Sequence, residues 1–433
     1  MPEAALEASA TYIQISEPGS WSVNGRTPRA RPGRPAEAEE PLRIAVYSHD
    51  TLGLGHMRRN LLIAETLAAA RPSTILLISG AVESRSFAVP PGVDYLSLPA
   101  LYKDSAGQYR PRRLGGSLEE LIALRSETIR GALRAFRPDV FIVDNVPAGA
   151  QGELVPALTE LRREGGTRFV LGLRDILDEP EAIRAEWSRA GAHRLLREIY
   201  DAIWIYGDRA VYDALAEYDF LAPYAARVRF TGYLDRRADE RPPDATSAAL
   251  LEQLERSGRR LALGTVGGGQ DGATLALNFA AAQFPDDMEG VLLTGPYMPE
   301  STARALRQMA AARDDLRIVD FLPEPAPLLR RADRVIAMGG YNTTCELLAY
   351  GKPALIVPRV RPRREQWLRA SRLRDLGALD ALHPDELTPD ALGAWLASDR
   401  VPTGKHAIDM NGLSRLPQLL AELYPAPLLS ARL

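Results

Sequence analysis

Short apolar runs separated by longer mixed segments dominate the chain from residue 42 onward. The runs in the first half are 42–47, 74–79, 139–145, 168–175 and 202–207, and those in the second half are 261–265, 290–295, 316–321, 334–340 and 353–359. Each is short and almost wholly apolar, which is typical of a strand buried on both faces. The segments between them have helical spacing, as in Asn60–Ala70 and Leu118–Phe136. The pattern predicts an α/β fold with parallel sheets covered by helices.

Two of these strands run into glycine-rich loops that a helix follows. The strand at 42–47 leads to Gly53 and Gly55, and the strand at 261–265 leads to Gly267, Gly268, Gly269 and Gly272. This repeated order predicts two Rossmann-like halves. In such sheets ligands bind at the carboxyl ends of the strands, so the cleft between the halves is the expected site.

The repeat also suggests where the domains begin and end. Residues 1–40 are rich in proline, glycine and charge and could not bury a core, so we expect a disordered tail. The expected domains are an N-terminal Rossmann-like domain (41–235), a linker region (236–258), a C-terminal Rossmann-like domain (259–400) and a C-terminal segment (401–433) whose helix packs back on the first domain.

Composition narrows the classes of function. The chain has 433 residues, a net charge of −3 and 25% charged residues, which fits a globular protein and argues against general nucleic-acid binding. The single cysteine, Cys345, fits a reducing cytoplasm. The N-terminus lacks the order of a signal peptide, and no apolar run is long enough to span a membrane. Almost all of the 53 basic residues are arginines, so an arginine cluster is weaker evidence of anion binding than usual.

Neither glycine loop matches a cofactor-binding fingerprint. Arg58 stands where the dinucleotide motif needs its third glycine, and the loop from Gly267 to Gly272 lacks the lysine of a P-loop. No Asp-x-Asp triplet and no His/Cys cluster with metal-ligand spacing occurs. We therefore expect neither a cofactor nor a metal.

A third motif, near residues 335–358, combines a strand, two glycines and a helix. A strand at Val335–Met338 leads to Gly339 and Gly340, and a helix is expected from about Thr343 to Gly351. Glycines before a helix N-terminus form an anion seat. Thr343-x-x-Glu346 has two interpretations: a capping box, or a Glu346 that accepts hydrogen bonds from a diol such as ribose.

These residues resemble the C-terminal domain of glycosyltransferase family 28. The matching positions are Gly339-Gly340, Thr343 to Glu346, Gly351-Lys352-Pro353, Val357-Pro358 and Glu365-Gln366. The resemblance implies a GT-B fold without an obligatory metal, in which Glu346 holds the ribose of a nucleotide-sugar and Gln366 its sugar, with Asn342 on the same loop. The loop Gly267, Gly268, Gly269, Gln270 is similar to the family's Gly-Gly-Ser-Gln loop near the diphosphate, with Gly269 in place of the serine and Asp271 added.

The first glycine loop, Gly53-Leu-Gly55-His56-Met-Arg58-Arg59, resembles instead the Gly-x-Gly-His-x-x-Arg loop of nucleotide-sugar hydrolases and of a set of bacterial predicted glycosyltransferases. In both groups the histidine is the expected catalytic base. A histidine suits that role because its pKa of about 6.5 lets it accept a proton near neutrality. Asp144, at the end of a strand in the same sheet, is the expected partner, although it could instead cap the following turn. His56 could likewise be only a turn or cap histidine, and His49 is interpreted as structural.

Arginines offer further candidate anion contacts. Arg58 and Gly53–Gly55 are candidates for phosphate or acceptor binding, and Arg174 could bind diphosphate, bind an anionic acceptor, or form a surface ion pair with its neighbours. A second cluster comprises Arg359, Arg361, Arg363, Arg364, Arg369, Arg372 and Arg374. Most of these are expected on a solvated face, with Arg359 nearest the ligand. The loop Tyr109–Gly116 is a hypothetical acceptor lid.

The sequence favours an inverting, metal-independent glycosyltransferase that moves a sugar from a nucleotide diphosphate-sugar, expected to be UDP-linked, to a hydroxyl acceptor. The alternative is a hydrolase in which His56 activates water. A 2-epimerase and a non-catalytic nucleotide-sugar sensor are further alternatives. We expect a cytoplasmic bacterial protein with small-molecule partners and no nucleic acid, and peripheral membrane contact is compatible with the arginine-rich segment.

Overall fold

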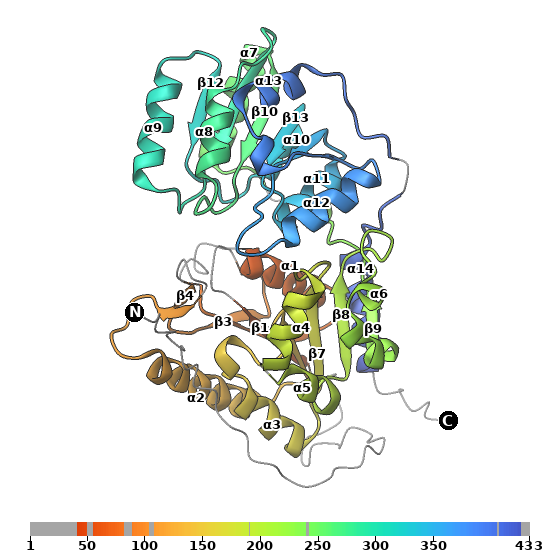
Figure 1. Cartoon of the computed structure of the whole chain (residues 1–433). Coiled ribbons are helices and arrows are strands. Elements are labelled where there is room, and N and C mark those ends of the chain that lie inside the picture. Colours follow the sequence, from red (N-terminus) through yellow and green to blue (C-terminus); the bar gives the residue numbers. More distant parts are fainter. Residues whose placement is uncertain are drawn as a thin grey trace, which may run out of the picture. The chain divides into compact units, whose positions relative to one another are not determined.

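Two parallel β-sheets organise the chain (Figure 1). The computed structural model describes residues 41–49, 55–81, 89–103, 108–189, 191–239, 242–404 and 407–425. All of these residues belong to one compact unit, Ala36–Leu433. We call residues 41–239 the N-terminal half and residues 242–404 the C-terminal half. The expected tail and Gly53 lie outside the described residues.

The N-terminal half contains a sheet of seven parallel strands within the described residues, in the order β3-β2-β1-β6-β7-β8-β9. Its strands are β1 (Leu42–Ser48), β2 (Ser73–Ser79), β3 (Val93–Ser97), β6 (Val140–Asp144), β7 (Arg168–Arg174), β8 (Ala202–Tyr206) and β9 (Val228–Phe230). A small antiparallel pair, β4 (Leu101–Lys103) and β5 (Tyr109–Pro111), lies apart from it. The order changes direction at β1, where β2 pairs on one side and β6 on the other, so β1 and β6 border the topological switch point.

The C-terminal half repeats this arrangement. Its described sheet has the order β12-β11-β10-β13-β14-β15, and all the pairs are parallel. The strands are β10 (Arg260–Thr265), β11 (Met288–Leu293), β12 (Leu316–Val319), β13 (Arg334–Ala337), β14 (Ala354–Ile356) and β15 (Asp380–Ala381). Its switch point lies between β10 and β13, the two strands that lead into the predicted glycine loops.

Helices connect the strands. In the N-terminal half they are α1 (Gly55–Ala70), α2 (Leu118–Phe136), α3 (Val155–Glu164), α4 (Pro180–Arg189), α5 (Ala192–Glu198) and α6 (Ala214–Glu217). The others are α7 (Ala245–Ser257), α8 (Ala273–Ala281), α9 (Glu300–Ala311), α10 (Ala326–Arg331), α11 (Tyr341–Tyr350), α12 (Glu365–Asp375), α13 (Pro389–Ala397) and α14 (Gly412–Leu423). The 3-10 turns are η2 (Ala150–Gly152), η3 (Asp219–Arg227), η4 (Arg237–Asp239) and η5 (Pro384–Glu386).

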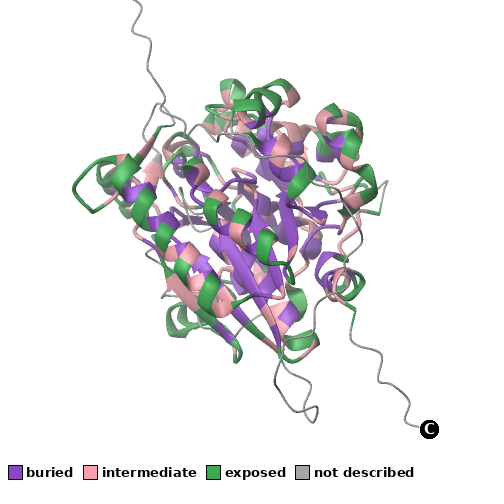
Figure 2. Ribbon diagram, turned by 90° about the horizontal axis from the view of Figure 1, so that it is seen from below, coloured by how far each residue is buried: buried purple, intermediate pink, exposed green. Residues whose placement is uncertain are grey.

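The central strands are buried on both faces, as their composition predicts. Every residue of β6 and β8 is buried, and buried residues gather in the strands while exposed residues lie on the outer faces of the helices (Figure 2). Helices with one apolar face cover each sheet, which is why their sequences alternate with helical spacing. α14 returns to pack on α1, and the Gly412 N–H donates to the Tyr233 carbonyl.

Two helices begin earlier than the sequence predicts. α1 begins at Gly55 and not near Asn60, and α11 begins at Tyr341 and not near Thr343. The first turn of α1 was missed because Arg59 and Asn60 are polar yet buried, so they interrupt the apolar pattern. As a consequence His56 lies in the first turn of a helix.

Candidate functional site

His56 forms a close pair with Asp144 at the carboxyl edge of the N-terminal sheet. Its Nδ1 lies 2.6 Å from Oδ2 of Asp144, which is the last residue of β6. An ionised carboxylate can only accept, so Nδ1 carries the proton and the lone pair is left on Nε2. The His56 side chain is 18% exposed, and Nε2 makes no hydrogen bond with the described residues. A base with this tautomer can take a proton from a bound hydroxyl.

The Asp144 carboxylate has further hydrogen-bond donors besides His56. It also accepts hydrogen bonds from Arg59, one turn after His56 on α1, and from the backbone N–H of His49 at 3.4 Å. The alternative in which the Asp144 side chain caps the following turn is therefore wrong. Burial alone would raise the pKa of Asp144, but the charges and hydrogen bonds of Arg59 and His56 hold it well below its usual range. Asp144 therefore remains a carboxylate.

Burial determines the protonation of His56. Desolvation lowers the pKa of His56 below its ordinary 6.5, and this outweighs the attraction of Asp144, while Arg59 and Arg174 lower it further. The imidazole is therefore neutral at neutral pH, as a general base requires.

His49 and the loop at Tyr109 lie beside this pair. The rings of His49 and His56 are 5.9 Å apart in an edge-on arrangement, and Tyr109 Oη lies 3.1 Å from Nε2 of His49. Arg112 of the same loop lies 5.9 Å from the ring of Tyr297 in the C-terminal half. The loop proposed from sequence as a lid is thus adjacent to the predicted base.

The glycine loop after β10 needs its glycines for close packing. Gly267 and Gly269 have positive φ values of 64° and 91°. A Cβ on Gly269 would lie 2.3 Å from the carbonyl oxygen of Thr294, so the serine found at this place in family 28 would not fit here. Gly268 is half-buried, and Gln270 is exposed. Gly272 precedes α8, and no side chain caps that helix.

The second glycine pair leads directly into α11. Gly339 has a φ of 74°, and a Cβ there would lie 2.4 Å from Ile356 Cγ2. Gly340 is the N-cap residue, and no side chain accepts from the first N–H groups of the helix. These donors and the helix dipole are therefore available to an anion. The half-buried Thr343 lies in this first turn.

The helix starts of α11 and α1 meet. Asn342 Nδ2 donates to the carbonyl oxygen of Gly55 at 3.0 Å, which joins the predicted nucleotide loop to the loop that carries His56. The guanidinium of Arg59 lies 5.4 Å from the ring of Tyr341. The predicted base and the predicted phosphate seat are therefore neighbours.

Glu346 is buried in the second turn of α11 and does not form a capping box with Thr343. That prediction is wrong because the helix begins two positions earlier and its N-cap is Gly340. Arg236 Nη1 lies 3.3 Å from Glu346 Oε1, and Arg236 Nη2 lies 2.5 Å from Glu324 Oε2. Burial raises the pKa of Glu346, and Arg58 and Arg236 oppose this.

Arg58 is directed toward the C-terminal half, where its Nη2 donates to the carbonyl oxygen of Pro323 at 2.8 Å. Arg58 therefore lies near Glu346 and Arg236 and not beside Asp144. The arginine that contacts the Asp144 carboxylate is Arg59.

Gln366 and Arg359 lie after β14, and Arg359 contacts the glycine loop that follows β10. Gln366 Oε1 accepts from the Arg359 N–H at 3.0 Å. The Arg359 guanidinium donates to Asp271 of the glycine loop and to Glu365 of α12, each at 2.9 Å. The added Asp271 therefore pairs with the arginine that is closest to the predicted diphosphate.

Of the other arginines of the segment, Arg361, Arg364, Arg372 and Arg374 are exposed, as predicted. Arg363, Arg364, Arg369 and Arg372 pair with carboxylates of the N-terminal half, respectively Glu186, Glu179, Asp175 and Glu217. Arg369 and Asp175 are each 1% exposed and form a bidentate pair at 2.6 and 2.7 Å. The prediction of a solvated face is wrong for Arg369, because a carboxylate distant in sequence buries with it.

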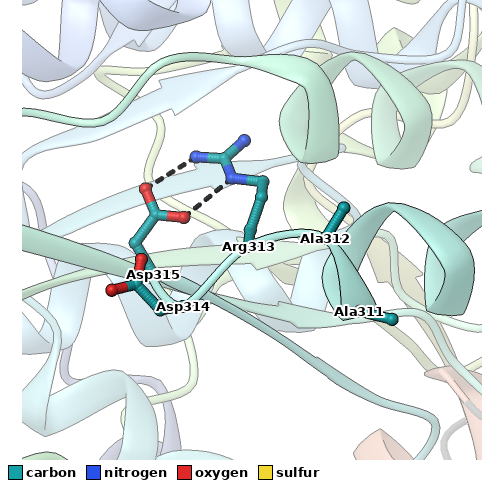
Figure 3. Close-up of a pocket in the computed structure, with 5 residues that line it drawn as sticks. All are labelled: Ala311, Ala312, Arg313, Asp314 and Asp315. Carbon is teal, nitrogen blue, oxygen red and sulfur yellow. Dashed lines mark hydrogen bonds and ion pairs between the residues drawn. The ribbon is translucent and has the colours of Figure 1, made fainter.

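A surface hollow of about 570 Å³ after α9 is not related to these residues. Residues 311–315 line it, and Arg313 donates to Asp315 at 2.7 and 2.8 Å (Figure 3). Because this arginine is already paired, we do not assign the hollow a role. Among the described residues, no three His, Cys, Asp or Glu side chains converge as metal ligands, and no helix has the length and apolarity needed to cross a membrane.

The sequence interpretation missed Arg59, Tyr341, Arg236 and Glu324. The spacing of His56 and Arg59 was an available signal, because residues three apart on a helix share a face. Arg236 and Glu324 gave no such signal, since they meet Glu346 only through the fold.

The comparisons with known proteins agree with this geometry. Residues 265–406 match the model of the glycosyltransferase family 28 C-terminal domain. The UDP-N-acetylglucosamine–N-acetylmuramyl-(pentapeptide) pyrophosphoryl-undecaprenol N-acetylglucosamine transferase of Mannheimia succiniciproducens is 34% identical over 140 residues, which are 32% of this chain and 39% of that protein. The chain thus matches well under half the length of this curated relative.

Solved structures match over most of the chain at low identity. MurG of Acinetobacter baumannii has a TM-score of 0.53 and 15% identity, covering 88% of this chain and 100% of that chain. UDP-GlcNAc 2-epimerase of Neisseria meningitidis has a TM-score of 0.56 and 13% identity, covering 88% and 98%. The GT-B fold is therefore confirmed, and the resemblance to family 28 is confirmed over residues 265–406. The resemblance of the histidine loop stays a prediction.

Proposed function

We propose that the protein is an inverting glycosyltransferase that needs no metal and transfers a sugar from a nucleotide diphosphate-sugar, UDP-linked as in the curated relative's name, to a hydroxyl acceptor. The observation that carries the proposal is the position of the His56–Asp144 pair, which the Asn342–Gly55 hydrogen bond joins to α11 of the family 28 domain. A base beside a donor-binding helix is the arrangement that this transfer needs.

In the proposed reaction, Nε2 of His56 accepts the proton of the acceptor hydroxyl while its oxygen attacks the anomeric carbon. The bond from that carbon to the diphosphate oxygen breaks, and the nucleoside diphosphate leaves with its electron pair. Asp144 holds Nδ1 and stabilises the imidazolium that forms. The cationic Arg59 limits how far the His56 pKa can rise.

The leaving diphosphate would be held by the two glycine-led helix starts at Gly272–α8 and Gly340–α11. Neither has a side-chain cap, so their N–H groups and dipoles can stabilise the developing charge. Glu346 would receive the ribose hydroxyls after Arg236 moves toward Glu324, with which it already pairs. Gln366 would contact the sugar with the amide nitrogen that its bond to Arg359 leaves available.

The experiment that tests the proposal is a thermal-shift screen with nucleotides and nucleotide-sugars, followed by product analysis of the donor that binds. We expect UDP-linked sugars to raise the melting temperature, because a ligand that binds only the folded state stabilises it. With a mixture of candidate alcohol acceptors, a glycosylated product should form. Free sugar released at a rate that no acceptor changes would instead assign hydrolysis, and an absence of any nucleotide binding would refute the proposal.

A further inference from the structure

Arg174 is a half-buried arginine that forms no hydrogen bond with any described residue. It ends β7, the strand beside β6, and its side chain is 15% exposed. Its Nε is buried without a hydrogen-bond partner, and its guanidinium forms no hydrogen bond with any described residue. The nearest carboxylate oxygen is Oε1 of Glu365, at 4.0 Å from Nη1. That distance is too long for a hydrogen bond.

Three arginines near Arg174 each have a close carboxylate partner. Arg59 is paired with Asp144, Arg369 with Asp175, and Arg363 with Glu186 at 2.7 Å. These contacts raise the pKa values of the three arginines despite burial. For Arg174 burial dominates and lowers the pKa to about 10.

Glu365 is near Arg174 but makes no hydrogen bond to it. Its Oε1 already accepts from Arg359 at 2.9 Å, while its Oε2 is buried with no partner. The two charges thus lie close together without the geometry that an ion pair of this burial requires.

The position of Arg174 indicates what would satisfy it. It ends β7, which pairs with β6, so it lies at the same sheet edge as Asp144 and its partner His56. Glu365, 4.0 Å from Arg174, is bound by Arg359. Arg359 in turn reaches Asp271 of the glycine loop. A ligand that extends from the base to the phosphate seat would pass this guanidinium.

We infer that Arg174 binds an anionic group, phosphate or carboxylate, of the ligand that lies between His56 and the glycine loop. A guanidinium fork matches two oxygens of such a group, and a bound anion would supply the hydrogen-bond acceptors that this half-buried guanidinium lacks. The group has two sources, the diphosphate of the donor or an anionic substituent of the acceptor. This inference rests on the proposed function for the identity of the ligand but not for the binding of the anion.

The test uses the full chain with Arg174→Gln, Arg174→Lys and, as a matched control, Arg374→Gln, which removes an exposed arginine that pairs with Asp375. Calorimetry measures the affinities for UDP, for UMP and for inorganic phosphate alone, and then the affinity for phosphate with the protein saturated in UDP. If Arg174 binds the donor diphosphate, R174Q lowers the affinity for UDP by about 10-fold or more and the affinity for UMP much less. If Arg174 binds an anionic group of the acceptor, R174Q leaves the affinity for UDP unchanged and lowers the affinity for phosphate by a similar factor. In either case R174K retains part of the affinity, and R374Q changes neither ligand.

A thermal melt without ligand separates binding from a structural role. An unpaired cation contributes little to the folded state, so R174Q should melt within about 2 °C of the wild type or above it. Unchanged affinity of R174Q for UDP and for phosphate would overturn the inference, and so would wild-type protein that binds neither anion, or a clear loss of melting temperature in R174Q. If UDP fails to bind but phosphate binds through Arg174, the proposed function fails and this inference stands.

Discussion

Arg369 is buried and Arg174 half-buried, and the two differ in their contacts although Arg369 pairs with the residue that follows Arg174. Arg369, on α12, makes two hydrogen bonds to Asp175 of the N-terminal half, and its guanidinium also lies 5.7 Å from the ring of Tyr341. Arg174 makes none, although it precedes Asp175 directly in the sequence. Arg369 thus finds its hydrogen-bond acceptors within the protein, whereas those of Arg174 would come from a bound ligand. The Arg369–Asp175 pair joins the two halves, whereas we have assigned Arg174 to the binding of a ligand.

The largest effect should come from breaking the completed pair. Arg369→Met leaves Asp175 buried beside the Tyr233 hydroxyl without its cation. Loss of one partner of a buried pair costs about 3–5 kcal/mol of the free energy of unfolding. Urea denaturation followed by tryptophan fluorescence measures it. A loss below about 1 kcal/mol would show that the pair is not a structural contact and would remove the contrast with Arg174.

Removing the charge of Glu346 should have an effect of intermediate size, because its partner Arg236 also pairs with Glu324. Glu346→Gln should weaken UDP binding about 10-fold or more, since hydrogen bonds to a charged group contribute about 1.5–3 kcal/mol. Arg236 keeps its bond to Glu324, so the free energy of unfolding should change less. Calorimetry with UDP measures the affinity and urea denaturation measures the free energy of unfolding, with Glu324→Gln as the matched variant in both. Equal affinities of wild type and E346Q would exclude Glu346 as the ribose ligand.

The smallest effect should come from Arg372, which pairs with Glu217 across the same two halves but in solvent, where its side chain is 48% exposed. Exposed pairs contribute about 0.2–1 kcal/mol. Arg372→Gln should therefore lower the free energy of unfolding by no more than that amount, and 0.5 M salt should remove most of the difference. A loss as large as that of Arg369→Met would mean that burial does not distinguish these pairs.

Much of the fold could be predicted from the sequence because the buried strands are uninterrupted apolar runs and the glycine loops recur after β1, β10 and β13. The His56–Asp144 pair could be predicted because both residues follow from strands that end at one sheet edge. The starts of α1 and α11 could not, because Arg59 and Tyr341 are placed by contacts with distant residues.

The roles of the arginines were equally hidden. In a chain whose basic residues are almost all arginines, a pattern cannot distinguish Arg369, buried on Asp175, from Arg374, exposed beside Asp375. The partners of Arg363, Arg364, Arg369 and Arg372 lie far away in the sequence and meet them only in the folded chain, so no local pattern identifies them. For the same reason the sequence left Arg174 with several open roles.

The most direct test of the account is the turnover and nucleotide affinity of His56→Ala, with His383→Gln as the control histidine in the C-terminal half. We expect His56→Ala to bind UDP within about threefold of the wild type and to lose about 10²–10⁴ of the rate of transfer, the usual contribution of a general base. The wild-type rate should rise with pH to a plateau whose midpoint lies below 6.5, because burial lowers the pKa of His56 and only the neutral form accepts a proton. Full turnover by His56→Ala would contradict the assignment of His56 as the base.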